Sequence, residues 1–490
     1  MVLTAELNPN SDTPLYRQLH DQIKAGIISG RLARGERLPA TRELAGSLGL
    51  NRATVSSAYE MLEAEGLIRG HVGRGSFVDG PPPVQGLDWE GLLRGAAELP
   101  ETLPSVGEDG ISFASSRPAQ QLFPLEEFRA TCAEVIASEE AAGILQLGSP
   151  GGYAPLRRYL LKEAHAHGLA RSGDDLTVTS GAQQALDLLQ RVLVGPGDTV
   201  LVEDPVYPGL RNVFSRAGAR LVGVPVSPDG LDLTALERAI QRERPRLLVV
   251  TPNFQNPTGA TLPLAARTAI LRMTREAGCI LVENDAYGEL RYEGDPLPAL
   301  KELDESGGVV LLKSFSKLSF PGLRVGWVVG PRPLLARLAE AKQWCDLHTD
   351  QLSQAVLLRF AESGRLAAHR KHVVDAGAER LAAVLDACAR ELPPGAEFTR
   401  PQGGMNLWVR LPAPLDASDL LPRAVREKVS YLPGRYFGVS RFESGSLRLS
   451  FAGLTPEKIR LGLAVLGQLF SAELRRTRAA RESDPAPALV

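Results

Sequence analysis

The chain has 490 residues, enough for two to four domains, and its hydrophobic share of 44% is ordinary for a soluble globular protein. A formal net charge of −2 gives no overall excess of basic residues that would by itself indicate nucleic-acid binding. The four cysteines are scattered without a CxxC pair, which argues against a disulfide framework and against a cysteine-ligated zinc site.

The sequence carries no sign of export or membrane insertion. No basic-then-apolar segment opens the chain, and no apolar run reaches about 18 residues. We therefore expect a cytoplasmic protein. His165 and His167 stand two residues apart and point to different faces of a helix, so we assign no metal site.

Composition divides the chain into four regions. Residues 1–78 are predicted to form short helices followed by a Gly-rich hairpin. Residues 79–108 are rich in Pro, Gly and Glu, which is typical of a linker stiffened by prolines. Residues 109–470 alternate short apolar runs with longer amphipathic stretches, the pattern of βαβ units around a largely parallel sheet. Residues 471–490 are predicted to be a disordered tail.

Residues 41–67 fit a helix-turn-helix. A helix over residues 41–48 is followed by Gly49, which makes the turn, and Asn51 can cap the next helix. The inward face of that second helix is apolar at the spacing i, i+3, i+4, i+7, and consists of Val55, Ala58, Tyr59 and Leu62. Its other faces carry short polar side chains suited to a major groove.

Basic side chains beside these helices favour DNA as the partner. Residues 1–78 hold nine Lys and Arg against eight Asp and Glu, so charge alone also allows a small helical interaction domain. Five arginines nevertheless cluster in one segment: Arg31, Arg34, Arg37, Arg42 and Arg52. The hairpin over residues 67–78 is predicted to be a two-stranded wing, whose Arg69 and Arg74 can reach phosphates or the minor groove.

This first domain closely resembles the winged-helix head of the GntR family of bacterial repressors. The runs that carry the resemblance are residues 14–19, 35–45 and 51–55. The resemblance implies a double-stranded DNA operator as partner, with Arg42, Arg52 and Thr54 as the DNA-contacting residues. Ala40 stands where the family usually has a helix-capping serine, and Thr41 can serve instead.

Five apolar runs of the second domain each end in a polar turn. These runs span residues 176–179, 200–202, 247–250, 280–282 and 309–312. In a parallel sheet the carboxyl ends of the strands meet at one edge, where ligands bind in open α/β folds. We therefore expect the five turns to line one site.

Lys317 follows the last of these runs, and its surroundings suit an imine with a phosphorylated aldehyde. Lysine is nucleophilic only when neutral, and a semi-buried, locally cationic site favours the neutral amine. Ser314 and Arg324 can hold a phosphate dianion. A single lysine is more often a solvated surface charge, so the assignment depends on the other turns.

The residue types of those turns suit pyridoxal 5′-phosphate (PLP). Asp285 can pair with the pyridine nitrogen and keep it protonated, which makes the ring an electron sink. Asn256 and Tyr287 can hydrogen-bond the phenolic oxygen of the ring, and Tyr207 can stack on its face. The segment Ser180-Gly181-Ala182-Gln183 opens a helix whose backbone N–H groups, those of Ala182 and Gln183 among them, favour an anion.

Arg448 lies far downstream between apolar neighbours and suits bidentate binding of a substrate carboxylate. Each residue alone has an ordinary structural explanation. Asn256–Gly259 can be a plain turn, Asp285 or Arg448 can form a structural ion pair, and Tyr207 can belong to the core. The complete set, in this order along the chain, is what favours a PLP site.

From about residue 110 to 465 the chain resembles the class I/II aminotransferases of the fold-type I PLP family. The matching motifs are Thr179–Gln184, Asn256–Gly259, Asp285–Tyr287, Ser314–Lys317 with Arg324, and Arg448. The resemblance implies an α/β domain with a mostly parallel sheet and a smaller C-terminal α+β subdomain. Leu147 is a departure, because these enzymes commonly have a tyrosine there that reaches the phosphate of the neighbouring subunit. Its absence argues against efficient transamination but not against PLP binding.

A GntR-like head joined to an aminotransferase-like body resembles the MocR type of bacterial transcription regulators. The resemblance implies a head-to-tail homodimer whose body senses an amino compound, or PLP itself, through aldimine exchange at Lys317. Arg448 would hold the carboxylate of that compound. The alternative function is an active PLP-dependent aminotransferase that transfers an amino group from an amino acid to a 2-oxo acid. Whether the chain is an enzyme, at most a weak one, stays open, as do the effector and the operator.

Overall fold

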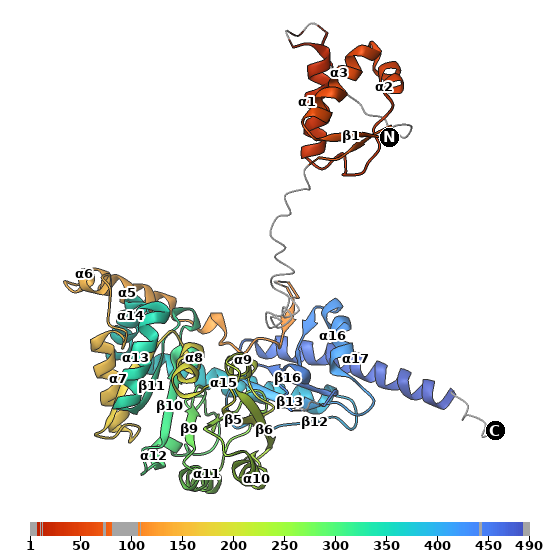
Figure 1. Ribbon diagram of the computed structural model, residues 1–490. Coiled ribbons are helices and arrows are strands. Elements are labelled where there is room, and N and C mark those ends of the chain that lie inside the picture. Colours follow the sequence, from red (N-terminus) through yellow and green to blue (C-terminus); the bar gives the residue numbers. More distant parts are fainter. Residues whose placement is uncertain are drawn as a thin grey trace. The chain divides into compact units, whose positions relative to one another are not determined.

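The structure, a computed structural model, describes residues 7–9, 11, 13–71, 75–80, 106–107, 109–440 and 443–483. The chain divides into two compact units, Met1–Pro100 and Glu101–Val490, each with its own hydrophobic core (Figure 1). Most of the predicted linker over residues 79–108 lies outside the described residues, and so do the last residues of the predicted tail, 484–490.

The first unit is a three-helix head with a hairpin. Its elements are α1 (Leu15–Ile28), α2 (Thr41–Leu48), α3 (Arg52–Ala64), β1 (Ile68–His71) and β2 (Gly75–Val78). The two strands pair antiparallel, with Ile68 opposite Val78. The predicted apolar face of α3 is buried in the core of this unit, where it packs against α1. The helix-turn-helix followed by a two-stranded wing is therefore confirmed.

The turn between α2 and α3 has the local chemistry that the sequence predicts. Gly49 adopts a left-handed φ of 64°, which a residue without Cβ reaches at least cost. Asn51 caps α3, since its side chain accepts a hydrogen bond from the Ala53 N–H at 3.0 Å. Ala40 occupies the N-cap of α2 and forms no side-chain cap bond, and Thr41 is the first helical residue, so it does not take over as N-cap.

The second unit is built on an eight-stranded sheet of order β4-β11-β10-β9-β8-β5-β6-β7. The strands are β4 (Asp174–Thr179), β5 (Thr199–Asp204), β6 (Arg220–Ser227), β7 (Gly230–Leu231), β8 (Leu247–Val250), β9 (Ile280–Asn284), β10 (Val309–Ser314) and β11 (Gly326–Pro331). The run from β10 to β6 is parallel. Because β11 is antiparallel to both β10 and β4, β4 has the same direction as β10. All five predicted turns therefore lie at one edge of a mostly parallel sheet.

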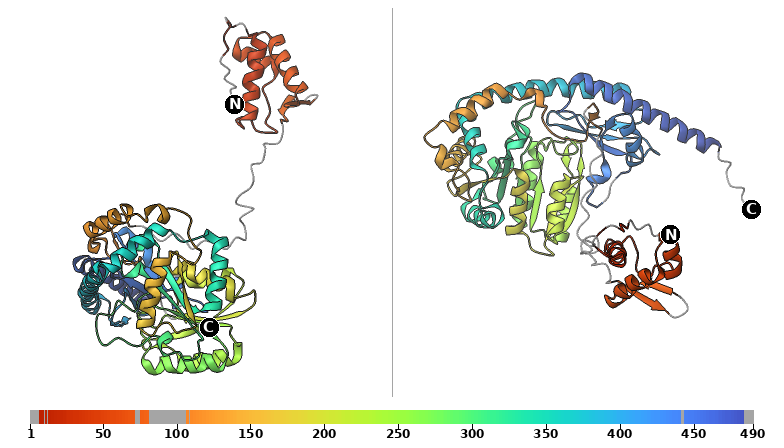
Figure 2. Two further views of the ribbon diagram at one scale, coloured as in Figure 1. Left: turned by 90° about the vertical axis from the view of Figure 1, so that its left-hand side faces the viewer. Right: turned by 90° about the horizontal axis from the view of Figure 1, so that it is seen from above.

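Helices cover both faces of this sheet (Figure 2). One face packs against α8 (Ala182–Leu193), α9 (Pro208–Arg216) and α13 (Arg332–Asp346). The other packs against α7 (Ala154–Ala166), α10 (Leu233–Glu243), α11 (Leu264–Glu276), α12 (Leu300–Leu303) and α14 (Gln351–Glu362). Successive strand residues alternate between the faces, so Val282 and Leu312 face α8 whereas Leu281 and Leu311 face the opposite layer.

The C-terminal part of this unit is a smaller α+β subdomain. Its antiparallel sheet has the order β12 (Glu397–Phe398), β13 (Asn406–Arg410), β16 (Ser446–Ser450) and β15 (Leu432–Pro433). Helices α15 (Arg365–Glu391), α16 (Ala417–Arg426) and α17 (Pro456–Ser483) share one core with it. A parallel pair of β3 (Ile111–Ser112) and β14 (Val429–Ser430) attaches the start of the unit to this subdomain.

Helix α17 crosses the predicted domain end at residue 470. It continues to Ser483, into the segment that the sequence predicted to be a disordered tail (Figure 1). Phe470 and Leu474 are buried in the core of the subdomain, which gives the helix an apolar anchor there. The unit also contains the helices α5 (Leu125–Ile136) and α6 (Ala141–Ile144). Among the described helices none has a stretch long and apolar enough to span a bilayer.

Candidate functional site

Lys317 ends a short 3-10 turn, Phe315–Lys317, directly after β10. Ser314 caps this turn, because its hydroxyl accepts a hydrogen bond from the Ser316 N–H at 3.1 Å. The Lys317 Nζ donates to the Ser116 carbonyl at 2.7 Å and lies 5.6 Å from the centre of the Tyr287 ring. Among the described residues no carboxylate pairs with this ammonium, which is the setting that a nucleophilic lysine requires.

Lys313, four residues earlier, has the opposite environment. Its Nζ lies 3.2 Å from Glu289 Oε1 and 3.4 Å from Asp285 Oδ2. Burial by itself would lower the pKa of Lys313, but the two carboxylates outweigh burial and raise that pKa above its usual value. Lys313 is therefore a permanently charged structural lysine, and the structure singles out Lys317 of the two.

Asn256, Tyr287 and Arg448 form a connected group beside Lys317. Asn256 Nδ2 donates to the Tyr287 hydroxyl at 3.3 Å, and Arg448 Nη1 donates to Asn256 Oδ1 at 2.9 Å. Burial by itself would raise the pKa of the Tyr287 hydroxyl. The Lys317 ammonium and neighbouring hydrogen bonds outweigh burial and hold that pKa below its usual value. The structure thus brings together residues from three distant parts of the sequence, as predicted.

Arg448 is a buried cation that pairs with no carboxylate of the described residues. Its side chain is 4% exposed, its Nη2 donates to the Ala114 carbonyl, and its Nε has no partner among the described residues. It stacks over Phe437, with Cζ 5.0 Å from the ring centre. Burial lowers its pKa to about 10, so the guanidinium stays charged at neutral pH. A buried charge is normally paired, and an external carboxylate would complete this site.

An anion cradle lies at the start of α8. The helix begins at Ala182 after Gly181, whose φ of 80° and lack of a side chain leave the first-turn N–H groups without a side-chain cap. A Cβ at Gly181 would overlap Arg324 Nη2, so the arginine lies directly against this loop. Arg324 Nη1 donates to the Ser316 hydroxyl at 3.2 Å. The backbone N–H groups at the start of α8, two serine hydroxyls and the Arg324 guanidinium together suit a phosphate dianion.

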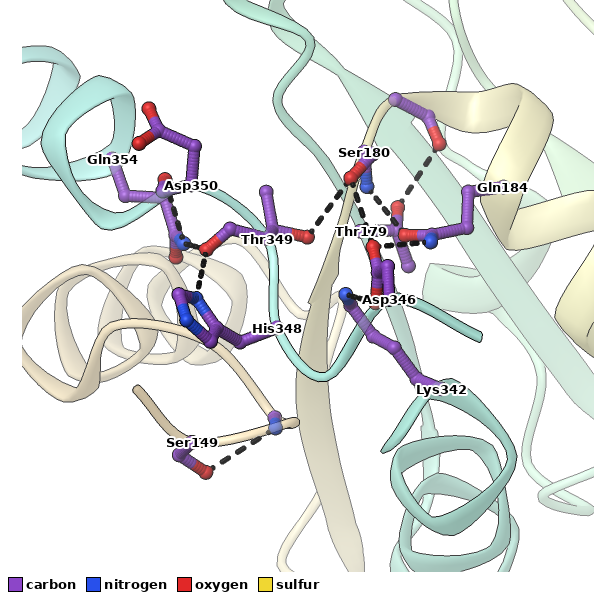
Figure 3. A network of polar contacts seen from close by, with 12 residues as sticks. Ser149, Thr179, Ser180, Gln184, Lys342, Asp346, His348, Thr349, Asp350 and Gln354 are labelled. Carbon is purple, nitrogen blue, oxygen red and sulfur yellow. Dashed lines mark hydrogen bonds and ion pairs between the residues drawn. The ribbon is translucent and has the colours of Figure 1, made fainter. Parts of the chain in front are cut away.

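A polar network connects this loop to α13 and to the segment before α14 (Figure 3). Asp346 accepts hydrogen bonds from Gln184 Nε2 at 2.6 Å and from the Ser180 hydroxyl at 3.3 Å, and its other oxygen pairs with the buried Lys342. The Thr349 hydroxyl reaches the same serine at 3.3 Å. Sequence reasoning missed this network because its members lie on α8, α13 and the segment before α14, and no local motif links them.

Tyr207 stands at the N-cap of α9 and is 39% exposed. Desolvation and the nearby Tyr287 raise its pKa, while Arg448 and Arg324 act against that rise, so the ring lies among the predicted site residues. Gln183 Nε2 donates to the Gly209 carbonyl at 3.1 Å, which ties the start of α8 to α9 beneath the ring. A partly open aromatic face here can stack on a planar ligand.

Asp285 does not join this group, which corrects the expectation from the sequence. One of its oxygens accepts from Asn253 Nδ2 at 2.9 Å and the other faces Lys313, on the sheet face opposite α8. Asn284 is on the site face instead, because Val282, two residues earlier on β9, packs against α8. The sequence analysis chose the carboxylate by residue type, whereas strand alternation decides which of two adjacent residues faces the site.

Glu203 is a buried carboxylate at the same sheet edge but on the other face. Burial raises its pKa to about 8, although it accepts hydrogen bonds from the Thr251 N–H and from Gln255. A carboxyl group with a raised folded-state pKa stabilises the fold below its unfolded pKa of about 4.3 and loses that contribution as pH rises toward 8.

Glu203 should therefore give the second unit a stability that falls between pH 5 and pH 8. We expect the Glu203→Gln variant to lose on the order of 2–4 kcal/mol of this pH dependence. Urea unfolding of the full chain at the two pH values measures it. The exposed Glu305→Gln is the matched control, and equal slopes for wild type and Glu203→Gln would contradict the assignment.

The first unit presents the predicted DNA-contacting residues on α2 and α3. Arg42 and Arg52 are exposed in the first turns of these helices, and Thr54 is half-buried. Arg69 on β1 is exposed, but its Nη2 lies 3.0 Å from Asp79 Oδ2, which offsets its charge. Arg74 lies outside the described residues. Of the predicted DNA contacts that the structure describes, the arginines without a carboxylate partner are therefore Arg42 and Arg52, on the two helices.

Comparison with known proteins matches both units to described families. Residues 15–78 match the bacterial regulatory proteins of the gntR family, and residues 108–466 match aminotransferase class I and II. A probable rhizopine catabolism regulatory protein MocR from Rhizobium meliloti is 31% identical over 487 residues, covering 95% of this chain and 96% of that protein. The chain belongs to the MocR-type transcriptional regulators.

This regulator joins a GntR-type DNA-binding head to an aminotransferase-like body, and the cofactor of the aminotransferase class I and II family is PLP. The body is 40% identical to a 2-aminoadipate transaminase from Thermus thermophilus, over 76% of this chain and 93% of that protein. A crystal structure of Pyrococcus horikoshii kynurenine aminotransferase has a TM-score of 0.73 and 35% identity, covering 75% of this chain and 92% of that one.

The residues present fit PLP. Lys317 lies without a carboxylate partner, the start of α8 with Ser316 and Arg324 suits its phosphate, and Asn256 with Tyr287 can hydrogen-bond its phenolic oxygen. The buried and uncompensated Arg448 adds a place for the carboxylate of an amino compound. This MocR-type body therefore has residues suited to the phosphate, the phenolic oxygen and the aldehyde of PLP, and to a ligand carboxylate.

Proposed function

We propose that this regulator attaches PLP at Lys317 and senses an amino compound whose carboxylate pairs with Arg448. The observation that carries the proposal is the buried Arg448 cation, which is hydrogen-bonded to Asn256 beside Lys317 and has no carboxylate partner among the residues that the structure describes. Bound PLP supplies an aldehyde carbon that binds amines reversibly. An amine with a carboxylate fits both charges of the site.

In this proposal each residue of the site has a distinct task. The N–H groups of Ala182 and Gln183, with Ser314 and Arg324, hold the phosphate. Asn256 and Tyr287 orient the ring through its phenolic oxygen, and Tyr207 covers one of its faces. Asn256 links ring and ligand, because its amide oxygen also fixes the Arg448 guanidinium.

A ligand can regulate DNA binding only if the body has two conformations that place the heads differently. The ligand must then bind these two conformations with different affinities. The test is a gel shift of the protein's own promoter fragment with PLP-loaded full-length chain, titrated with a panel of amino acids and amines. A compound that moves both the PLP absorption band and the DNA affinity is the effector. PLP alone becomes the signal if only its addition changes DNA affinity.

DNA binding is proposed to depend on Arg52 at the start of α3. We expect Arg52→Ala to weaken binding to the promoter fragment by about tenfold or more, since a lost guanidinium contact to a base or phosphate costs about 1–3 kcal/mol. Fluorescence anisotropy at fixed salt measures the change. Arg17→Ala on α1 removes the same exposed charge outside the helix-turn-helix and should change affinity less than about twofold. Equal losses in both variants would contradict the assignment.

A homodimer is proposed from exposed apolar side chains on the second unit. Leu145, Leu147, Trp344 and Leu347 are 66%, 72%, 88% and 55% exposed. The two segments that carry them are joined through Gln351, which follows Leu347 closely and whose Nε2 donates to the Gln146 carbonyl at 2.7 Å. Exposed clusters of this kind mark protein interfaces. The resemblance to MocR-type regulators adds a head-to-tail arrangement.

We expect Trp344→Glu to shift the full-length chain from dimer toward monomer, because the change places a charge in an apolar contact. Light scattering after size exclusion gives the mass. Leu461→Glu, at a 60% exposed position on α17, is the matched control and should leave the mass unchanged. If the dimer persisted in Trp344→Glu and dissociated in Leu461→Glu, the dimer interface would be assigned to α17 instead.

Transamination is the second candidate function. Its support is the 40% identity of the body to a protein named 2-aminoadipate transaminase. The test is steady turnover of 2-aminoadipate, and then of a broad donor panel, with a 2-oxo acid acceptor. Absence of turnover across the panel would leave regulation as the function of the body.

A further inference from the structure

Asn284, the last residue of β9, has a buried polar atom without a hydrogen-bond partner in the part of the chain that the structure describes. Its side chain is 8% exposed, and its Nδ2 reaches Thr251 Oγ1 at 3.5 Å. Its Oδ1 has no hydrogen-bond partner among the described residues. Buried polar side-chain atoms are almost always paired, so an unpaired one beside a ligand site indicates a group that the bound ligand completes.

The pleat of the sheet places Asn284 on the cofactor face. Val282 and Leu312 pack against α8, so Asn284 and Ser314, two residues further along their strands, point to that same face. The start of α8 and Ser314 are the proposed phosphate site. A ring held between that site and Lys317 therefore lies over the end of β9 on the side of Asn284, not of Asp285.

No carboxylate of the described residues stands in for Asp285 on this face. Leu312 is the register partner of Asn284 on β10, and Thr251 follows the end of the neighbouring β8. Asp204, which ends β5, is the next acidic residue on the face. Its two oxygens accept the N–H groups of Val439 and Ser440, each at 3.0 Å, and it leans toward β6, where a Cβ at Gly223 would overlap it.

We propose that Asn284 contacts the pyridine nitrogen of PLP and, as a neutral amide, leaves that nitrogen without the carboxylate that would keep it protonated. This inference rests on the proposed function, since it requires PLP at Lys317. A carboxamide can meet the nitrogen with either end, because its oxygen accepts and its NH₂ donates, and Thr251 can hydrogen-bond whichever end remains.

The consequence is a site that holds amines but converts them slowly. PLP withdraws electrons strongly only when its ring nitrogen is protonated, and a carboxylate partner is what maintains that proton. A neighbouring charge of opposite sign shifts a pKa by about 1–3 units, and the amide of Asn284 offers no such charge. Binding at Lys317 and Arg448 is kept, whereas removal of a proton from the ligand is disfavoured. This is the behaviour expected of a sensor.

The first test compares the affinity of the apo full-length chain for PLP with that for its carbocyclic analogue, in which CH replaces the ring nitrogen. We expect the wild type to prefer PLP by less than about tenfold, the effect of one neutral hydrogen bond. Asn284→Asp should widen this preference by a further tenfold or more. Asp285→Asn should leave the wild-type preference unchanged, because Asp285 lies on the other face.

The outcomes separate the two residues. A strong wild-type preference for PLP that Asp285→Asn abolishes would overturn the inference and restore Asp285 as the partner. A preference that does not respond to Asn284→Asp would also overturn it. If that variant does not fold, Asn284→Ser replaces it, and the preference should then fall toward one; an unchanged preference would count against Asn284.

A second readout follows the ligand. Mixed with excess L-leucine in single-turnover conditions, Asn284→Asp should release 4-methyl-2-oxopentanoate at least tenfold faster than the wild type, as the amino group passes to the cofactor. A wild type that already matches the variant would contradict the inference. Failure of the wild type to bind PLP at all would overturn the proposed function as well. If instead Asn284→Asp left the ratio of the affinities for PLP and its carbocyclic analogue unchanged, only this inference would be overturned.

Discussion

Replacing Lys317 with alanine should abolish covalent attachment of PLP to this regulator. The prediction follows from comparing Lys313 with Lys317, since of these two lysines only Lys317 has no carboxylate partner among the described residues. Borohydride reduction followed by intact-mass spectrometry should show one cofactor added per wild-type chain and none on Lys317→Ala. Loss of attachment should also remove every response of DNA binding to amino compounds.

Lys313→Ala is the matched control, because it removes a lysine on β10 that lies four residues before Lys317. Lys313 is paired with Glu289 and Asp285 on the opposite sheet face, so its loss should lower stability and leave attachment intact. Attachment that survives in Lys317→Ala but disappears in Lys313→Ala would reverse the assignment of the two lysines. If DNA binding by Lys317→Ala still responded to amino compounds, sensing through this lysine would be contradicted.

Replacing Arg448 with methionine should lower the affinity for amino acids by about 10²-fold or more. Truncating one partner of a buried charge pair costs roughly 2–5 kcal/mol, and methionine keeps most of the packing volume. The measurement is a spectral titration of the PLP-loaded chain with L-leucine and with 3-methylbutylamine, the same molecule without its carboxylate. The amine should bind wild type and variant within about threefold.

Arg380→Met provides the protein control for this experiment. Arg380 is another buried arginine of the second unit, but its guanidinium donates to the Leu454 and Ala376 carbonyls, both at 2.7 Å. Its removal should not discriminate leucine from the amine. An Arg448→Met variant that weakens both ligands equally would show that Arg448 shapes the pocket and does not bind the carboxylate.

The sequence predicted most of the fold because its signals are local. The alternation of apolar runs with amphipathic stretches predicted a mostly parallel sheet, and the five runs became β4, β5, β8, β9 and β10 with their carboxyl ends at one edge. The spacing of apolar residues in α3 likewise predicted which of its side chains are buried. The end of α17 was missed, because Phe470 and Leu474 are anchored by residues distant in sequence.

The site was predicted less completely, and the errors have a common cause. Residue type predicted the lysine, the amide, the tyrosine and the arginine as parts of one site, and the structure places these four side chains close to one another. It could not predict that Asp346 supports the loop before α8, because these hydrogen bonds join α13 to residues at the start of α8, far away in the sequence. It also could not predict that Arg448 has no acidic partner within the described ranges.

The sequence by itself determined that a winged helix-turn-helix precedes a PLP-type body, and that Lys317 is a candidate for cofactor attachment. Only the tertiary structure decided between neighbours such as Asn284 and Asp285. Adjacent residues of a strand point to opposite faces, and packing against α8 on one side and Lys313 on the other fixes which face each one meets. Residue type indicates which chemical role a side chain can perform, whereas the packing of the sheet decides which side chain faces the site.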